Sequence, residues 1–346
     1  MRIIRFWKAT CGMRLSIAGK FVHSAYLALL LAASLATAGC LNSLNINLIP
    51  PSAPLSEVVI SGHGRDKVLL LPVQGVITAF SGSSAMGRKT DSTLAYIVAQ
   101  LDAARKDKRI KAVVLKIDSP GGQVAACDAI YEELMRFKRE TGVAMVAQQM
   151  SLAASGGYYL SMVGDRVLAQ PTTVTGSVGV IMMKLDAGGL LTKIGVRDDS
   201  VKSGESKDLL SMFKQMTPEE REILTRIMDA MHKKFISVVT ESRKEVVDPT
   251  TAFDGRVFVA QDALERNLVD RIGYLPDSIE EAKKLAGLKE ATVIRFAPGK
   301  KVHLNAYSAA EAESEVSGAS AGLEPVSLKL PFMVNAGPQF LYIWGM

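Results

Sequence analysis

Residues 112–122 read AVVLKIDSPGG, an apolar run that ends in a turn with two glycines. A strand that is apolar at nearly every position is typical of a parallel sheet with both faces covered by helices. The run at 143–147 (VAMVA) repeats this pattern and is followed by a second turn, Ala153–Gly157 (AASGG). Two buried strands, each leading into a glycine-rich turn, predict an α/β fold with right-handed crossovers.

The segments around these strands agree with that fold class. Residues 68–73 are apolar enough for another strand, and apolar residues at helical spacing over 94–101 and 130–137 predict amphipathic helices. Residues 217–220 (TPEE) form a capping box with proline at the first helical position, which predicts the start of a helix. The apolar stripe of that helix continues to Val238. The motifs occur once each, so no internal repeat is expected.

The two glycine-rich turns are candidates for an acyl-transfer site. Gly121 and Gly156 allow the backbone to approach a ligand closely, and amides at such turns can be directed at a developing oxyanion. Ser155, beside Gly156, is the candidate nucleophile. Either turn alone would be read more simply as a tight structural turn, but the pair favours an oxyanion hole.

A serine nucleophile needs a base, and the histidines are poorly placed for that role. They are scattered through a predicted signal segment, a spacer, the polar side of a long helix and a C-terminal tail: His23, His63, His232 and His303. A lysine can serve instead if burial lowers its pKa from about 10.4 towards neutrality. Residue chemistry alone does not rank the candidates downstream of Ser155, which are Lys184, Lys193, Lys202 and Lys207.

Several function classes have no support in the sequence. The phosphate-binding patterns GxxxxGK[ST] and GxGxxG are absent, and so are HExxH and CxxC, so we expect no nucleotide cofactor and no metal. Five of the 41 basic residues, and none of the 35 acidic ones, lie before residue 40. The rest of the chain is therefore nearly neutral, which argues against a nucleic acid partner.

The motifs occur in an order that resembles the bacterial signal peptide peptidase A family. The similarity covers roughly residues 68 to 285 and rests on six motifs: DSPGG at 118–122, ASGGYY at 154–159, PTTVTGSVGV at 171–180, SGESKD at 203–208, MTPEE at 216–220 and DGRV at 254–257.

The resemblance implies a role for each matching residue. Ser155 corresponds to the nucleophile, Lys207 to the general base and Ser177 to a serine that helps to hold the lysine. The backbone amides of Gly156 and Gly121 correspond to the oxyanion hole.

The resemblance also implies a ClpP/crotonase-like spiral of ββα units in one catalytic domain. Single-copy members of the family assemble as homo-oligomeric rings in which serine and lysine come from neighbouring subunits. The implied substrates are signal-peptide remnants left in the membrane after export. Two other readings stay open: a crotonase-like acyl-CoA enzyme, which a signal segment disfavours, and a non-enzymatic lipoprotein scaffold, which the presence of both Ser155 and Lys207 disfavours.

The N-terminal region predicts membrane attachment. A basic stretch precedes the apolar run Ala25–Ala38, which has the length of a signal-peptide core and leaves the rest of the chain on the extracytoplasmic, periplasmic side. The sequence TAGC at 37–40 is similar to a lipobox, so lipidation at Cys40 and an uncleaved N-terminal anchor are both open. Either Met1 or Met13 is the initiator.

The expected organisation has four parts. They are a signal peptide or membrane anchor at 1–39, a spacer at 40–65, the peptidase domain at 66–297, and a tail at 298–346 with an apolar end. That end is compatible with a docking segment or with an edge strand. Cys127, among apolar neighbours in a predicted helix, is expected to be a small core residue.

Overall fold

The computed structural model describes residues 55–80, 82–83, 89–90, 92–298, 305–308 and 339–345. The chain divides into Met1–Ala53 and Pro54–Met346, and the described residues all belong to the second unit. The predicted signal segment and Cys40 lie outside them. Within the described ranges, every helix is too short or too polar to cross a lipid bilayer.

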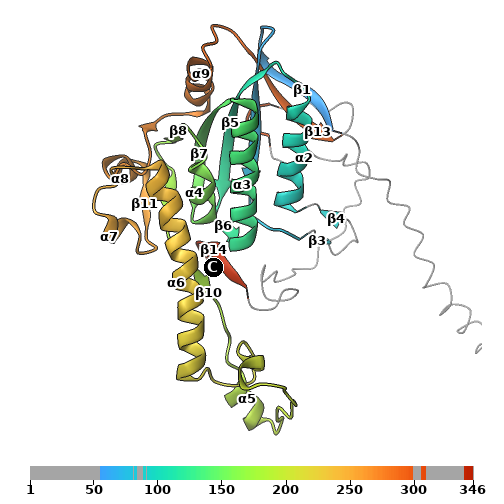
Figure 1. The fold of residues 1–346 in the computed structure, drawn as a ribbon, viewed down its shortest axis with the longest axis vertical. Helices are drawn as coiled ribbons and strands as arrows, with labels where there is room; N and C mark the ends of the chain where they lie inside the picture. The colour runs from blue at the N-terminus through green and yellow to red at the C-terminus, as the bar shows by residue number, and fades with distance from the viewer. Residues whose placement is uncertain are drawn as a thin grey trace, which may run out of the picture. The chain divides into compact units, whose positions relative to one another are not determined.

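The centre of the described chain is a mainly parallel sheet with helices on both faces (Figure 1). Only the β1–β13 and β9–β11 pairs are antiparallel among its described strands. The strands, in their order across the sheet, are β1 (Leu55–Gly62), β13 (Thr292–Pro298), β2 (Lys67–Gln74), β5 (Ile110–Ser119), β7 (Ala144–Ala154), β8 (Arg166–Ala169) and β12 (Arg271–Ile272). Beside them, β9 (Val174–Gly176) pairs with the end of β7 and with β11 (Val257–Val259).

The two faces of the sheet take alternate residues of the same strand. In β5, Val113, Leu115 and Ile117 pack into the larger core, while Ala112 and Val114 pack into the smaller one. This period of two, with both faces apolar, is why the strand is apolar at nearly every position of residues 112–117.

Helices from different parts of the chain cover these faces. Figure 1 shows α2, α3 and α4 on one face, and residues of α9 pack into the smaller core on the other. The helices are α2 (Thr93–Arg105), α3 (Val124–Thr141), α4 (Gly156–Ser161), α5 (Gly188–Lys193), α6 (Pro218–Ser242), α7 (Pro249–Ala252), α8 (Ala260–Glu265) and α9 (Leu275–Leu285), with the 3-10 helix η1 (Glu205–Asp208).

Residues 183–216, here called the arm, contain α5 and η1 and leave the sheet after β10 (Ile181–Met182). Every residue of the arm is described, and none is buried. The arm returns to the core through α6, which begins at the predicted capping box: Thr217 and Glu220 bond each other's backbone amides. The second half of α6 buries Phe235 and Val238, whereas Ile227 in the first half is exposed.

The structure differs from the expected organisation at both ends of the peptidase domain. Leu55–Gly62, expected to be spacer, is strand β1 and pairs antiparallel with β13. Its inward and outward residues are only partly covered because it is an edge strand, so it lacks the apolar run that marks the central strands. The apolar end of the expected tail forms β14 (Phe340–Ile343), the middle strand of a small sheet between β10 and β6 (Gly121–Gln123). A two-stranded pair, β3 (Gly82–Ser83) and β4 (Lys89–Thr90), completes the described strands.

Candidate active site

Ser155 lies at the junction between β7 and α4, in a conformation that L-residues rarely adopt. Its φ is 52° and its ψ is −114°, which costs on the order of 1–3 kcal/mol for a residue with a side chain. The backbone is held there because the Ser155 N–H donates to Gly176 O at 2.7 Å and the Tyr159 N–H donates to Ser155 O at 2.8 Å. The side chain is 1% exposed, and its Oγ has no hydrogen-bond partner among the described residues.

The two glycine-rich turns are in contact. A Cβ on Gly121 would come within 2.6 Å of Gly156 N, so no side chain fits between them. Gly121 has a φ of +99°, a conformation that glycine adopts without strain. Its N–H donates to Ser119 Oγ at 3.0 Å, so this amide is already engaged. Gly156, the first residue of α4, lies directly beside the serine.

Ser177 directly follows β9, the strand that pairs with the end of β7 next to Ser155. In the parallel pairing of β7 and β9, Ala154 lies opposite Gly176. Ser155 and Ser177 follow these two residues, so they lie at the ends of neighbouring strands. Ser177 also has a positive φ, 54°, and its N–H donates to Arg256 O at 2.7 Å. Gly121, Ser155, Gly156 and Ser177 are called the serine site below. They come from three segments of the chain and are all buried.

The lysine that the resemblance pairs with Ser155 is not part of this buried group. Lys207 is in η1 on the arm, and its side chain is exposed. Among the described residues, Lys207 Nζ has no hydrogen-bond or ion-pair partner, and no bond joins it to Ser155. A single chain therefore brings together four of the predicted site residues and leaves the fifth on an exposed surface.

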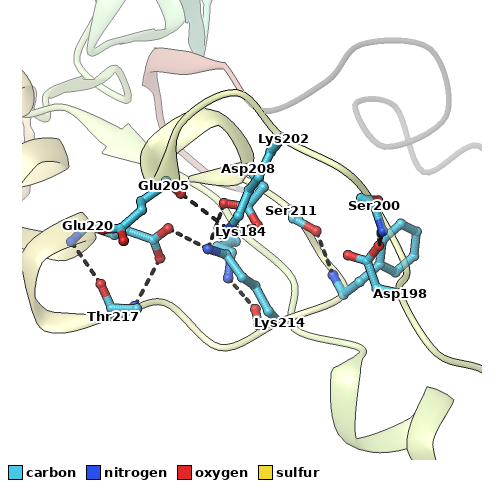
Figure 2. Close-up of polar contacts among 11 residues, drawn as sticks. Lys184, Asp198, Ser200, Lys202, Glu205, Asp208, Ser211, Lys214, Thr217 and Glu220 are labelled. Atoms are coloured by element: carbon cyan, nitrogen blue, oxygen red, sulfur yellow. Dashed lines mark hydrogen bonds and ion pairs between the residues drawn. The ribbon is translucent and has the colours of Figure 1, made fainter.

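Ion pairs hold the part of the arm that carries Lys207 (Figure 2). Asp208 accepts from Lys202 Nζ and Lys214 Nζ, each at 2.8 Å. These bonds hold the pKa of Asp208 at about 2, below its ordinary value of 3.8. Lys214 Nζ also donates to Glu220 Oε1 at 2.6 Å, which links η1 to the capped end of α6.

Two other candidate bases already have partners. Lys202 Nζ contacts the Asp208 carboxylate, and Lys184 Nζ donates to Lys214 O at 2.7 Å. His232, expected to be solvated, is half-buried, and its Nε2 lies 3.1 Å from Val178 O. Lys193 lies exposed at the end of α5. These contacts disfavour Lys184 and Lys202 as the general base, and Lys207 and Lys193 remain as candidates.

Sequence reasoning missed two residues that shape the ends of the central strands. Asp118 Oδ1 accepts from Ser151 Oγ at 2.6 Å and from Leu152 N at 3.1 Å, so it orders the part of β7 that leads to the serine. Lys116 is 1% exposed, and burial, with the nearby charge of Arg295, lowers its pKa to about 8. Its Nζ donates to the carbonyls of Ala306 and Ser308. The sequence signals for these two residues are the lysine inside an apolar run and the aspartate at the end of that run.

The arrangement supplies two of the parts that acyl transfer needs. A small nucleophile is buried at one of two glycine turns that contact each other, so backbone amides lie near it. No described residue stands within hydrogen-bond distance of Ser155 Oγ to remove its proton. The missing component is a base.

Comparison with known proteins gives matches over most of the described chain. The model of peptidase family S49 matches residues 137–289, and that of Clp protease matches residues 83–175. A relative from Enterococcus faecium, named as a signal peptide peptidase SppA, is 34% identical over 241 residues, which is 69% of this chain and 70% of that protein. Protease 4 of Salmonella typhi is 34% identical over 192 residues, or 55% of this chain and 31% of that protein.

Among solved structures, a mutant of the 1510-N membrane-bound stomatin-specific protease, in complex with a substrate peptide, is 16% identical. The match covers 68% of this chain and 94% of that one, with a TM-score of 0.41. The expectation of a ClpP/crotonase-like α/β fold is confirmed by the Clp protease match together with the parallel sheet described above.

Proposed function

Because the chain belongs to the signal peptide peptidase A family, peptidase family S49, and is a serine peptidase, we propose that it cleaves peptide bonds with a Ser155/Lys207 dyad. The observation that carries the proposal is the state of Ser155. Its backbone is strained, its side chain is buried, and its Oγ lacks a partner beside two glycine turns. Such strain persists at functional sites because the surrounding structure holds it.

In the proposed mechanism Ser155 Oγ attacks the carbonyl carbon of the scissile bond. Neutral Lys207 accepts the hydroxyl proton as the bond forms, and then passes it to the leaving amine. The amides of Gly156 and Gly121 stabilise the oxyanion, after the Gly121 N–H turns from Ser119 Oγ. Water then hydrolyses the acyl-enzyme by the same proton transfers in reverse. Ser177 is proposed to accept or donate a hydrogen bond that orients the lysine.

The exposure of Lys207 supports a dyad formed between subunits. A general base must be neutral, and burial of Lys207 against a neighbour would supply the desolvation that favours the neutral form. The arm also exposes large apolar side chains that a neighbouring copy would cover: Leu185, Leu190, Ile194, Val196, Val201, Met212 and Phe213. A homo-oligomeric ring is therefore proposed as the active form.

Signal-peptide remnants are the proposed substrates, on the strength of the name carried by the Enterococcus relative. The test is degradation of purified signal peptides by the wild type and by Ser155→Ala. Alanine fits the same turn, so the variant should fold and assemble normally while its rate falls by at least about a thousandfold. A fluorophosphonate probe should label the wild type alone. Retention of more than a few per cent of the activity by Ser155→Ala would reject Ser155 as the nucleophile.

Membrane attachment through the N-terminal segment is a separate proposal, supported by the basic and apolar stretches that end at Cys40. If Cys40 is lipidated, the mature protein begins at that residue and carries acyl mass. Intact-protein mass spectrometry that instead finds residues 13–39 on the mature chain would favour an uncleaved anchor.

A further inference from the structure

Helix α6 runs between the arm and the serine site (Figure 1). Its first turn is tied to the arm by the ion pair between Glu220 Oε1 and Lys214 Nζ, at 2.6 Å. His232 lies about 18 Å further along the same helix, at a rise of about 1.5 Å per residue. There the helix packs against the larger core through the buried Phe235. One rigid element therefore contacts both the arm and the core around the serine site.

One face of α6 meets the serine site at two places. Phe235 packs edge-on against Tyr159 at a ring-centroid distance of 5.0 Å, and Tyr159 belongs to α4, the helix that begins beside the nucleophile. His232 is three residues before Phe235 and so lies on the same face of the helix. Its Nε2 is 3.1 Å from the carbonyl oxygen of Val178, the residue that follows Ser177. The helix thus contacts both turns that carry a serine of the site.

The turn that carries Ser177 is held by a hydrogen bond on each side. On one side the Ser177 N–H donates to Arg256 O at 2.7 Å. On the other side His232 supplies the bond to the carbonyl of Val178, whose side chain is fully buried. Between them Ser177 keeps a φ of 54°, which is unfavourable for a residue with a side chain and persists because its surroundings hold it. Loss of the imidazole would release one side of this turn.

The contact also assigns a hydrogen on the imidazole. A carbonyl oxygen only accepts hydrogen bonds, so Nε2 of His232 carries a hydrogen and donates it. The imidazolium ion has a hydrogen on Nε2 as well, so protonation of the ring leaves this bond in place. An Nε2 that donates to a carbonyl cannot accept a proton from a serine. The bond therefore suits His232 to hold the backbone and not to serve as a base through that nitrogen.

We propose that His232 is a positioning residue for the peptidase reaction: its Nε2–H holds the Val178 carbonyl and thereby keeps the Ser177 hydroxyl where it can bond the lysine. The proposal rests on the proposed function, because that function gives Ser177 the task of orienting Lys207. Since His232 acts through Ser177 and not on the substrate, its loss should slow the chemical step and leave substrate binding nearly unchanged.

The kinetic test compares substitutions at two neighbouring positions of α6. His232→Met keeps the length of the side chain and removes the donor, and should lower kcat by about ten- to a hundredfold while KM changes by less than about twofold. His232→Gln places an amide N–H at a similar distance from the backbone and should keep kcat within about threefold of the wild type. Lys233→Met, at an exposed position, is the matched control and should retain full activity. A wild-type kcat in His232→Met, or equal losses in His232→Met and His232→Gln, would overturn the inference.

Two measurements test the contact without any activity. Amide hydrogen exchange in a peptide that covers residues 174–180 should be about fivefold faster in His232→Met, because one neutral hydrogen bond is lost, and unchanged in His232→Gln. Nitrogen NMR of the wild type should find hydrogen on Nε2 and none on Nδ1 of the neutral His232 ring. Equal exchange in the three proteins, or a neutral ring with its hydrogen on Nδ1, would refute the contact. The NMR result does not depend on the folding of any variant.

These outcomes are distinct from failure of the proposed function. If Ser155 is not the nucleophile, Ser155→Ala keeps its activity, whereas hydrogen exchange and NMR still report on the bond from His232 to Val178. If Ser155→Ala and Lys207→Arg are inactive but His232→Met is fully active, the proposed function stands and the positioning role of His232 is wrong.

Discussion

The serine site and the arm are held by different kinds of interaction. The serine site is buried in the larger core, where neighbouring strands and backbone hydrogen bonds hold Ser155 and Ser177 in conformations that cost free energy. The arm has no buried residue, and side-chain ion pairs such as Asp208–Lys214 hold its shape. Exposed ion pairs contribute little stability. The surroundings of Ser155, the nucleophile of the proposed dyad, are therefore formed within a single chain. Lys207 is exposed and needs a neighbouring surface to bury it.

The contrast between the buried serine site and the exposed arm is tested most strongly at Lys207. Lys207→Arg should lower the hydrolysis rate by about a thousandfold, because a guanidinium stays protonated and cannot act as a base. Fluorophosphonate labelling of Ser155 should fall in parallel while the melting temperature stays unchanged, since Lys207 is exposed. Lys193→Arg, on the same arm, is the matched control and should retain full activity. An active Lys207→Arg enzyme would remove Lys207 from the mechanism.

Mixed oligomers distinguish a dyad within one chain from a dyad between chains. Ser155→Ala and Lys207→Ala proteins are each expected to be inactive. After unfolding and refolding together in equal amounts, about a quarter of the interfaces should pair an intact serine with an intact lysine and regain activity. The activity should also fall on dilution below the assembly constant. Mixed oligomers of proven composition that stay inactive would show that the dyad closes within one subunit.

A smaller effect on the hydrolysis rate is expected from disrupting the ion pairs of the arm. Asp208→Asn removes the negative charge that pairs with Lys202 and Lys214, and should slow hydrolysis by about ten- to a hundredfold by misplacing Lys207. Asp198→Asn is the control, because Asp198 bonds only Ser200 within the same arm (Figure 2). Added salt should mimic part of the loss in the wild type and none of it in Asp208→Asn. Equal rates for the two variants would show that the ion pairs do not position the lysine.

The same carboxylate predicts a pH dependence. Its folded-state pKa is lowered to about 2, so the ion pairs contribute stability above the ordinary value of 3.8 and lose it as the pH falls from about 4 to about 2. Proteolytic nicking of the arm in this range should increase in the wild type. Asp208→Asn should be nicked readily at every pH, with no added change in that window.

The sequence was sufficient for the centre of the fold because the central strands are buried on both faces. Val113 and its neighbours form a nearly continuous apolar run that ends at the motif DSPGG. The sequence does not predict the edge strand β1, because Val59 and its neighbours are exposed and because its partner β13 lies far along the chain. The sequence does not predict the position of β14 for the same reason: the pairing of a strand that is distant in sequence depends on tertiary contacts.

The candidate site was predicted in parts. Local patterns predict that Ser155 and the two glycines lie at strand-to-turn junctions, and the structure has them there, while their catalytic roles stay predictions. The sequence does not predict that Lys207 is exposed in a single chain. A lysine buried within a subunit and a lysine buried only between subunits have the same sequence pattern. The buried Lys116 was missed because a lysine in an apolar run has no sequence signal for its acceptors, the carbonyls of Ala306 and Ser308.

The positive φ of Ser155 has an evolutionary consequence. Glycine adopts this backbone conformation without strain, so Ser155→Gly should raise the free energy of unfolding by about 1 kcal/mol while abolishing the activity. Ser155→Ala keeps the strain and should melt like the wild type, which makes the difference between the two melting temperatures the measurement. Replacing the nucleophile by glycine would then make the protein more stable, so the serine is retained only while selection acts on the activity. Relatives that have lost the activity would accordingly be expected to carry glycine at this position.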